Sequence, residues 1–398
     1  MARTRTDILV AGGGIAGLTA AAACAHAGHS VTLVSPDTPV TEPAADGSDL
    51  RSTAFLQPAV ALFDKIGLWS DLGPQATALD GLRIVDSIGW PPEVRTTREF
   101  QSTDISDQPF GWNLLNWQTL GRLVQSLERH KHVDLCYGTA FKSMVQRDRE
   151  VIVTLTNGDS IAARLVVAAD GRNSAVRAAA GIDVATTRYG QKALAFVVGH
   201  AIPHENVSTE IYNEGGPFTM VPLPDQDGQP ASAIVWMNPS AKALELADLP
   251  DADFAAHASE RSCHWLGPMT LKSPRRIWPI ISQRAQALTA PRVALLAEAA
   301  HVVPPIGAQG LNTSLNDIAA LMGALTAHPG DPGADTVLAT YRRARTADIR
   351  ARVAAIDLFN RVTKSGTPWL QSLRLNGLKL VHDAAPLRRS VMRAGIGG

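Results

Sequence analysis

The segment from Asp7 to Val34, DILVAGGGIAGLTAAAACAHAGHSVTLV, predicts the fold of the N-terminal part of the chain. It begins with a short apolar strand over 7–10, continues through a glycine turn into an alanine-rich helix that ends near Ala27, and returns as a strand over 30–34. The glycines of the turn follow the spacing Gly-x-Gly-x-x-Gly, at Gly12, Gly14 and Gly17. In this order of elements, the pyrophosphate of a dinucleotide lies at the N-terminus of the helix. We therefore predict an α/β protein that begins with a Rossmann-like dinucleotide-binding unit.

The end of the second strand departs from the usual dinucleotide-binding pattern. An Asp or Glu normally binds the adenosine ribose at this point, whereas this chain has Ser35, with Asp37 two residues further on. A hydrogen bond to a charged acceptor is roughly twice as strong as one to a neutral hydroxyl. Ser35 therefore predicts weaker binding of the dinucleotide. A glycine turn that binds no ligand is the alternative interpretation of this segment.

The composition excludes several functional classes. The chain has 398 residues, enough for two or three domains, and its 37 basic and 37 acidic residues give a formal net charge of zero. With this balance the composition has no excess of basic residues of the kind that binds nucleic acid. The three cysteines, Cys24, Cys136 and Cys263, have no metal-binding spacing and favour a reducing, cytoplasmic location. We predict a protein without a metal site or a disulfide framework.

The uncharged run from Ile8 to Pro36, which follows Arg3 and Arg5, could be mistaken for a signal peptide. Five glycines and two histidines interrupt its apolar pattern, and a strand, a turn and a helix explain it better. We expect neither a secretion signal nor a transmembrane helix.

A second motif follows a predicted β-hairpin in the middle of the chain. Two apolar strands, over 151–156 and 160–169, are separated by an Asn-Gly pair, which is a strong turn signal. The second strand ends at Asp170 and Gly171, just before a helix for which Ser174 is the predicted N-cap. The motif therefore places a carboxylate at the end of a buried strand.

The third motif is the segment from Val293 to Leu321, VALLAEAAHVVPPIGAQGLNTSLNDIAAL. It predicts a buried strand, a loop rich in glycine and proline, and a helix whose first turn follows Gly310. Gly307 and Gly310 have no Cβ, so the backbone of the loop can approach a flat ligand closely. The start of the helix directs unpaired N–H groups and a partial positive charge at that ligand.

The three motifs, near residues 12, 170 and 298, together resemble those of the class A FAD-dependent aromatic hydroxylases, the family of p-hydroxybenzoate hydroxylase. The chain looks most similar to the ubiquinone-biosynthesis hydroxylases, because of its length, the sequences RSTAF at 51–55 and WPI at 278–280, and the lack of an extra C-terminal domain. The resemblance implies FAD as the cofactor and NAD(P)H as the co-substrate that reduces it. It also implies that O2 supplies the oxygen atom added to an electron-rich ring.

The same resemblance implies which residues bind FAD. In the third motif the family has Gly-Asp where this chain has Ala297 and Glu298, so the carboxylate expected to bind the ribitol is retained on a longer side chain. The full predicted set is Gly12, Gly14, Ala16, Gly17, Ser35, Arg51, Gln118, Asp170, Gly171, Glu298, Pro305, Gly307, Gln309, Gly310, Leu311 and Asn312.

Two members of this set have a competing interpretation. Arg51 lies near the flavin in the family, but a solvated arginine at the start of a helix explains the sequence equally well. A helix is predicted over 117–130, and either Asn116 or Gln118 at its start could contact FAD. Alternatively, Asn116 is the N-cap of that helix.

No side chain is predicted to be catalytic, because the flavin itself carries out the difficult step in this family. His301 could act as a base, but its place beside Ala299 and Ala300 favours a packing and hydrogen-bonding role.

The predicted fold class is α/β, with a Rossmann-like FAD-binding domain, an inserted antiparallel β-sheet substrate domain and a C-terminal helical region. The FAD-binding domain is discontinuous and comprises residues 1–80, 112–182 and 270–333. Short strands separated by Gly, Pro and Asn predict the antiparallel sheet, which belongs to a substrate domain of residues 81–111 and 183–269. Trp236 and Trp278 could line its substrate site, although each is more simply a core aromatic residue. Residues 334–398 are predicted to form a docked helical cap, or alternatively a surface for lipid or a partner protein.

The similarity to the ubiquinone-biosynthesis hydroxylases implies a prenylated phenol as substrate. It also suggests peripheral contact with the inner face of a membrane or with a multiprotein complex. One alternative is a hydroxylase of a small soluble aromatic acid, for whose carboxylate Arg83, Arg188 and Tyr212 are available. The other is a non-catalytic scaffold or accessory protein of a quinone-biosynthesis complex, suggested by the altered residues Ser35 and Ala297-Glu298.

Overall fold

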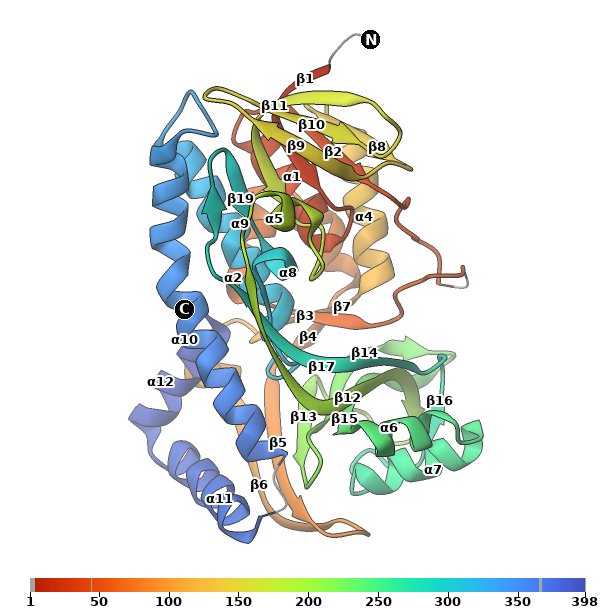
Figure 1. Ribbon diagram of the computed structural model, residues 1–398. Coiled ribbons are helices and arrows are strands. Elements are labelled where there is room, and N and C mark those ends of the chain that lie inside the picture. The colour runs from red at the N-terminus through yellow and green to blue at the C-terminus, as the bar shows by residue number, and fades with distance from the viewer. Residues whose placement is uncertain (1–3, 44, 365–366, 398) are drawn as a thin grey trace.

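The computed structural model describes residues 4–43, 45–364 and 367–397. Its chain forms two large β-sheets, one above the other in Figure 1, with helices packed around the upper sheet and along one side of both.

The upper sheet is the dinucleotide-binding core that the N-terminal segment predicts. Its parallel strands lie in the order β19-β11-β1-β2-β8, with β1 (Thr4–Ala11) in the centre. The other strands of this sheet are β2 (Val31–Ser35), β8 (Val133–Tyr137), β9 (Phe141–Gln146), β10 (Val151–Leu155), β11 (Ser160–Ala168), β18 (Thr289–Ala290) and β19 (Val293–Leu295).

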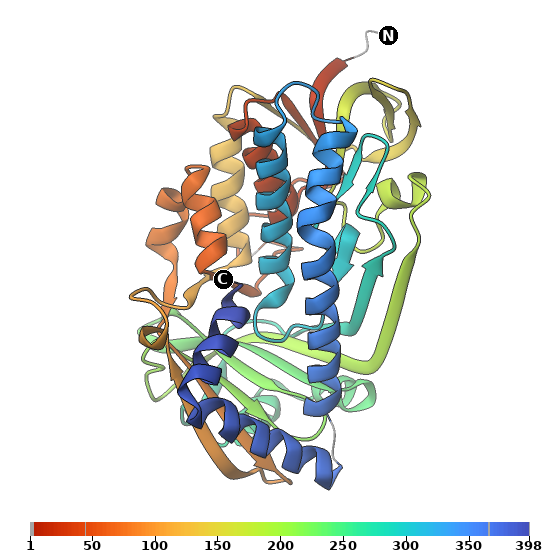
Figure 2. The ribbon, with the colours of Figure 1, turned by 90° about the vertical axis from the view of Figure 1, so that its left-hand side faces the viewer.

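Apolar helices cover this sheet. The helix α1 (Ile15–His26) is buried along most of its length because alanine lets it pack closely against neighbouring elements. It lies beside α4 (Asn116–Glu128) and α9 (Gln309–Ala327), as Figure 2 shows. One continuous apolar core joins these helices to the strands. The remaining helices of this region are α2 (Gln57–Lys65), α3 (Trp69–Leu72), α5 (Ala175–Ala179) and α8 (Ala297–Ala300).

The lower sheet is mainly antiparallel, as predicted, with one parallel pair between β5 and β13. One of its faces packs on α6 (Ser240–Ala247) and α7 (Asp251–Arg261) through a core that includes Trp236, which is therefore a core residue. The strands are β5 (Gly81–Ile88), β6 (Glu93–Gln101), β12 (Val184–His200), β13 (Val207–Tyr212), β14 (Phe218–Gln226), β15 (Gln229–Pro239), β16 (Met269–Leu271), β17 (Arg276–Ala285) and β20 (His301–Val302).

A small sheet of β3 (Ser52–Leu56), β4 (Thr77–Leu79) and β7 (Gly111–Leu115) completes the strands of the described chain. Because β17 and β20 pair in the lower sheet and β19 in the upper one, the segment 276–302 passes between the two sheets. The domain boundaries stated above stay a prediction.

Three helices form the C-terminal region: α10 (Asp335–Thr363), α11 (Pro368–Asp383) and α12 (Ala385–Ile396). The first runs past both sheets, and the other two pack beside β5 and β6 (Figures 1 and 2). Buried charges fix this contact, since Asp86 on β5 forms ion pairs with Arg374 on α11 and with Arg95 on β6. Arg374 also donates to the carbonyl of Thr363, 3.2 Å away. The prediction of a docked helical region is confirmed for the described residues.

The structure corrects four local predictions. Helix α9 begins at Gln309, so Gly310 lies inside its first turn and not before it. Arg51 precedes the strand β3, which excludes the helix-start interpretation. Asn116 is the first residue of α4 and not its N-cap, which is Leu115. The strands of the antiparallel sheet are not all short, since β12 has 17 residues.

Candidate functional site

The carboxyl ends of the parallel strands bring the three sequence motifs together. Gly12 follows β1, Ser35 ends β2, Asp170 follows β11 by two residues, and Glu298 follows β19 by three. All these strands run in the same direction, so their carboxyl ends meet at one edge of the sheet (Figure 1). In open α/β sheets this edge binds the ligand, at the point where the strand order reverses. Here that point lies between β1 and β11.

The glycines of the turn have distinct physical roles. A Cβ on Gly12 would lie 2.2 Å from the carbonyl oxygen of Ala169, and one on Gly17 would lie 1.9 Å from that of Gly12. Both positions therefore need glycine for close packing of strand, turn and helix. A Cβ on Gly14 would meet no atom within 4 Å, so Gly14 faces open space at the start of α1. Ala16, in the first turn, packs against the core.

Ser35 lies directly against this turn. Its hydroxyl donates to the carbonyl of Asp37 at 2.8 Å, and a Cβ on Gly13 would lie 2.6 Å from its Oγ. Since the proton is already used, the hydroxyl oxygen can only accept a hydrogen bond from a ligand. Ser35 is thus placed as the sequence predicts, with the reduced hydrogen-bonding capacity expected of a neutral residue.

Asp170 has one carboxylate oxygen without a partner. Its Oδ2 accepts from the N–H of Val176 at 3.1 Å, while Oδ1 is buried and has no donor among the described residues. Gly171 follows with a φ of +82°, and Ser174 caps α5 by accepting from the N–H of Arg177, as predicted. A buried oxygen without a donor is uncommon in folded proteins, and at this strand end Oδ1 is available to accept a hydrogen bond from a ligand.

The loop before α9 is an open turn. Gly307 and Ala308 both have left-handed backbone angles, with φ of 59° and 56°, and Pro305 precedes them half-buried. A Cβ on Gly307 or Gly310 would meet no atom within 4 Å. The first N–H groups of any α-helix have no acceptor within the helix. Those of Gly310 and Leu311 find no backbone or side-chain acceptor elsewhere among the described residues.

Asn312 and Gln309, two of the residues predicted to bind FAD, use their side chains to stabilise the loop before α9. Asn312 accepts from the N–H of Leu56 at 2.9 Å and donates to the carbonyls of Ala54 and Ala308, each at 2.7 Å. Gln309 donates to the carbonyls of Gly307 and Gly395 at 2.9 and 2.8 Å. Any contact of these two residues with a cofactor would therefore come from the backbone.

Arg51 belongs to a small cluster near Glu298. It forms an ion pair of 2.6 Å with Asp49 and stacks over the ring of Trp278, 5.2 Å from its centroid. Burial acts to raise the pKa of Asp49, but the hydrogen bonds from Arg51 and Asn116 outweigh it and lower that pKa. Glu298 is exposed and forms no hydrogen bond or ion pair among the described residues, while its charge acts to raise the pKa of Arg51. Gln118 lies half-buried in the first turn of α4.

A buried network holds Ala297, the residue that replaces the glycine of the family motif. Ala297 has a left-handed φ of 54°, a conformation that costs a non-glycine residue on the order of 1–2 kcal/mol. Its N–H donates to Asp317 at 3.1 Å, and Asp317 also binds His301 and Arg345, each at 2.7 Å. Burial acts to raise the pKa of Asp317, but His301 and Arg345 hold it below its usual value. His301 therefore has the packing and hydrogen-bonding role that the sequence favours.

The sequence interpretation missed Asp49 and Asp317. Asp49 belongs to none of the sequence motifs, although its position two residues before Arg51 signals a local ion pair. Asp317 is an acidic residue within the apolar sequence LNDIAAL, and a charged residue on a buried helix face signals a paired carboxylate.

Comparisons with known proteins agree with this geometry. The family model described as FAD binding domain matches residues 5–355. The chain belongs to this family of FAD-dependent aromatic hydroxylases. It is 32% identical to ubiquinone hydroxylase UbiL of Rhodospirillum rubrum, over 98% of this chain and 89% of that protein. It is 26% identical to 3-demethoxyubiquinol 3-hydroxylase of Escherichia coli over the full length of both. The crystal structure of p-nitrophenol 4-monooxygenase PnpA from Pseudomonas putida shares the fold, with a TM-score of 0.80 at 19% identity, over 100% of this chain and 99% of that one.

The chain is therefore an FAD-dependent monooxygenase, and the site fits FAD. Four features are complementary to groups of FAD: the open space at Gly14, the unpartnered oxygen of Asp170, the exposed carboxylate of Glu298 and the free N–H groups of α9. Bound FAD, reduced by NAD(P)H, supplies the oxygen-activating chemistry that no protein side chain can provide. Which of the predicted residues contact FAD stays a prediction. Among the described residues, no cluster of His, Cys, Asp and Glu could hold a metal ion.

Replacing Gly14 with Val should abolish FAD binding. The added side chain would occupy the open space at the start of α1 without disturbing the packing at Gly12 and Gly17. The measurement is the flavin absorbance retained after FAD is added and free cofactor is removed. Gly323→Val, in α9, where a Cβ is also unobstructed, provides a matched control. Full flavin retention by the Gly14 variant would refute the predicted role of the glycine turn.

Replacing Glu298 with Ala should weaken FAD binding by about tenfold to a hundredfold, because a hydrogen bond to a charged group contributes about 1.5–3 kcal/mol. Fluorescence titration of the apoprotein with FAD measures the dissociation constant. Since Glu298 forms no hydrogen bond or ion pair among the described residues, thermal stability without FAD should change little. An unaltered dissociation constant would show that Glu298 does not replace the aspartate of the family motif.

Proposed function

We propose that this enzyme hydroxylates a prenylated phenol in ubiquinone biosynthesis, and that the residues at the carboxyl edge of the upper sheet bind its FAD. The observation that carries the proposal is the full-length similarity to two proteins named as ubiquinone-pathway hydroxylases, together with cofactor-complementary groups on this chain.

The lower sheet has an apolar face on the side away from α6 and α7, and this face is consistent with an apolar substrate. On this face Ala193 and Met237 pack with Ile306 of the loop before α9, and Val235 and Trp278 lie partly buried beside them. An apolar surface next to the cofactor loop suits a phenol with a hydrocarbon chain and helps to exclude water from the reacting centre.

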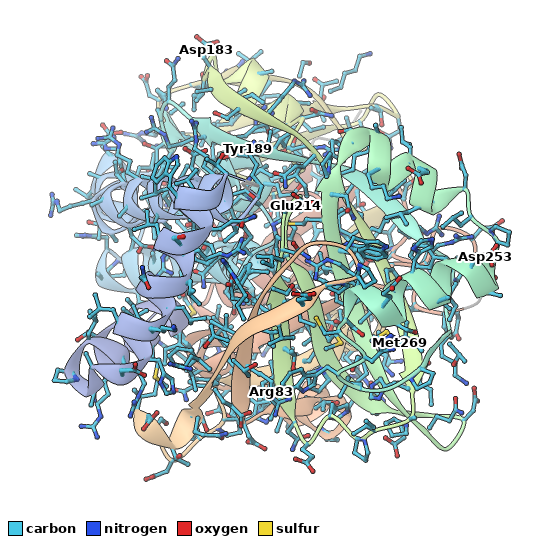
Figure 3. The ribbon with its side chains drawn as sticks, turned by 90° about the horizontal axis from the view of Figure 1, so that it is seen from below. Arg83, Asp183, Tyr189, Glu214, Asp253 and Met269 are labelled. Atoms are coloured by element: carbon cyan, nitrogen blue, oxygen red, sulfur yellow. The ribbon has the colours of Figure 1, made fainter. Side chains whose placement is uncertain are left out.

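The residues available to bind an aromatic carboxylate do not converge. Arg83, which is labelled in Figure 3, pairs with Glu99 at 2.7 Å and stacks on Trp265. Tyr212 donates its hydroxyl proton to the buried carboxylate of Glu210, which would repel an acid. Arg188 is exposed on β12. This arrangement favours a neutral phenol over a soluble aromatic acid.

The proposed activity can be tested with purified protein, FAD, NADH or NADPH, and a prenylated phenol under air. The flavin absorbance should bleach on addition of NAD(P)H and recover with O2. Mass spectrometry should detect one oxygen atom from 18O2 in the product. Turnover of 4-hydroxybenzoate but not of a prenylated phenol would favour the acid alternative. Protein that takes up no flavin at saturating FAD would favour the non-catalytic scaffold.

We further propose that α11 and α12 contact an anionic membrane surface. None of the described helices is long and apolar enough to cross a bilayer. On α11 the exposed residues Trp369, Leu373 and Leu380 are 65, 53 and 63% exposed, and their spacing places them on one side of the helix. Of the five basic side chains in residues 367–397, Arg374 is buried against Asp86 and Arg388 pairs with Asp104, which leaves Lys379, Arg389 and Arg393 for a membrane surface, beside one acidic side chain. An apolar stripe with basic neighbours is typical of helices that lie in a membrane interface.

Vesicle sedimentation tests this contact. The protein should bind vesicles that contain phosphatidylglycerol more strongly than vesicles of phosphatidylcholine, with a loss at high salt. The double variant Trp369→Ser, Leu380→Ser should lose the binding, whereas Val145→Ser, which removes an exposed side chain on β9, should retain it. Equal binding of both variants and the wild type would refute the assignment of the surface.

A further inference from the structure

The small sheet contains a buried asparagine whose side-chain oxygen has no hydrogen-bond donor. Asn113 on β7 is only 1% exposed. Its Nδ2 donates to the backbone carbonyl of Pro222 on β14 at 2.8 Å. Since a carbonyl can only accept a hydrogen bond, this contact fixes which amide atom faces Pro222. The other amide atom, Oδ1, is buried and has no donor within the described part of the chain.

The alternation of β7 directs Asn113 toward the lower sheet. Leu114 belongs to the core of the upper sheet, whereas Leu115 packs against a cluster of the lower sheet that contains Val197 and Ala233. Successive strand residues point to opposite faces, so Asn113 shares the face of Leu115. The strands β3, β4 and β7 lie between the two large sheets in Figure 1 and form a roof over the lower one.

The lower sheet is accessible beside this roof. Thr219 and Val221 on β14 and Val235 on β15 are half-buried. Thr219 lies opposite Val235 in the register, and Val221 follows two residues later, so the three side chains share one face. Met220, between the first two, belongs to the core that packs on α6 and α7. These three residues, called the floor below, therefore lie on the face that we propose for the substrate.

Asn113 lies at the border between the roof and the floor. Pro222, which accepts from its amide, directly follows Val221 of the floor. Across the roof, the residue paired with Asn113 is Ala54, which is half-buried and has only a methyl group. Neither the floor nor Ala54 donates to Oδ1. The oxygen is therefore available to a donor that enters between the roof and the floor.

The cofactor loop borders the same region. The side chain of Asn312 donates to the carbonyls of Ala54 on the roof and Ala308 in the turn before α9, each at 2.7 Å. Ile306, in the same turn, belongs to the apolar cluster against which Val235 of the floor packs. The turn therefore contacts both the roof and the floor. A ring that lies on the floor is consequently next to the loop that the sequence motifs assign to FAD.

The chemistry of Oδ1 selects its ligand. An amide oxygen only accepts hydrogen bonds and carries no charge. A phenol hydroxyl supplies the proton that such an acceptor needs, whereas a carboxylate or a quinone carbonyl has none to donate. The valine and alanine side chains of the floor and the roof suit the hydrocarbon part of the same molecule.

We propose that Asn113 binds the ring hydroxyl of the substrate through Oδ1, and that this contact sets both the specificity for a phenol and the orientation of its ring on the floor. The assignment rests on the proposed function, because it takes a neutral phenol as the substrate. The hydroxyl keeps its proton and donates a hydrogen bond to the amide oxygen. A hydrocarbon of the same shape leaves Oδ1 unpaired in apolar surroundings, so the site discriminates against it.

The test measures the binding of two ligands to the full chain loaded with FAD, without NAD(P)H. The ligands are ortho-prenylphenol and prenylbenzene, which lacks only the hydroxyl, and the change in flavin fluorescence reports their dissociation constants. Asn113→Leu removes the acceptor with little change in volume. Asn238→Leu is the matched control, because Asn238 on β15 is also buried and has an unpartnered amide atom. It follows Met237 of the substrate face and so points to the opposite face.

We expect the wild type to bind ortho-prenylphenol about fivefold more tightly than prenylbenzene, as for one hydrogen bond between neutral groups. Asn113→Leu should bind both ligands with nearly equal affinity. Asn238→Leu should keep the wild-type preference. A general loss of stability would weaken both ligands alike and would leave their ratio unchanged.

Two results would overturn the role of Asn113 alone. One is a folded Asn113→Leu protein that keeps the wild-type preference, and the other is a wild type that binds both ligands without preference. If Asn113→Leu does not fold, Asn113→Ala should lose the preference in the same way, and a retained preference would equally refute the proposal. A wild type that binds neither ligand would refute the prenylated phenol as substrate, and the role of Asn113 with it.

Discussion

The buried carboxylate of Asp317 organises the cofactor edge of this enzyme. It joins the N–H of Ala297 and the ring of His301, in the segment after β19, to the guanidinium of Arg345 on α10. Removing one partner from such a network would leave a buried group unsatisfied, and that is more costly than the net gain from each bond. The network therefore fixes the segment after β19, the strand β20 and the two long helices α9 and α10 as one unit.

Close backbone contacts complete the same edge. Gly12 and Gly17 allow β1, the turn and α1 to approach the end of β11 more closely than any side chain permits. The loop before α9 then extends this edge to the lower sheet, where Ile306 packs against Ala193 and Met237. Ile306 therefore connects the cofactor edge to the sheet face that we propose for the substrate, and such packing provides the fixed geometry that a reaction between a flavin and an aromatic ring requires.

Much of this arrangement can be predicted from the residues. The spacing of the glycines, the Asn-Gly turn before β11 and the Gly/Pro-rich loop are local signals, and each depends on backbone geometry within a few residues. They predict the strand ends that carry Gly14, Asp170 and Glu298. The start of α9 and the strand after Arg51 were misjudged, because a left-handed Ala308 and the pairing of β3 with β7 leave no clear local pattern.

The sequence by itself determined the order of elements, the dinucleotide-binding unit and the edge at which the cofactor motifs meet, since parallel strands of one sheet must end on the same side. Only the tertiary structure decided which charges are paired. The contacts Asp86–Arg374 and Asp317–Arg345 join residues far apart in the chain. No periodicity or local propensity encodes such partners, because their energies arise only once the surrounding residues exclude water.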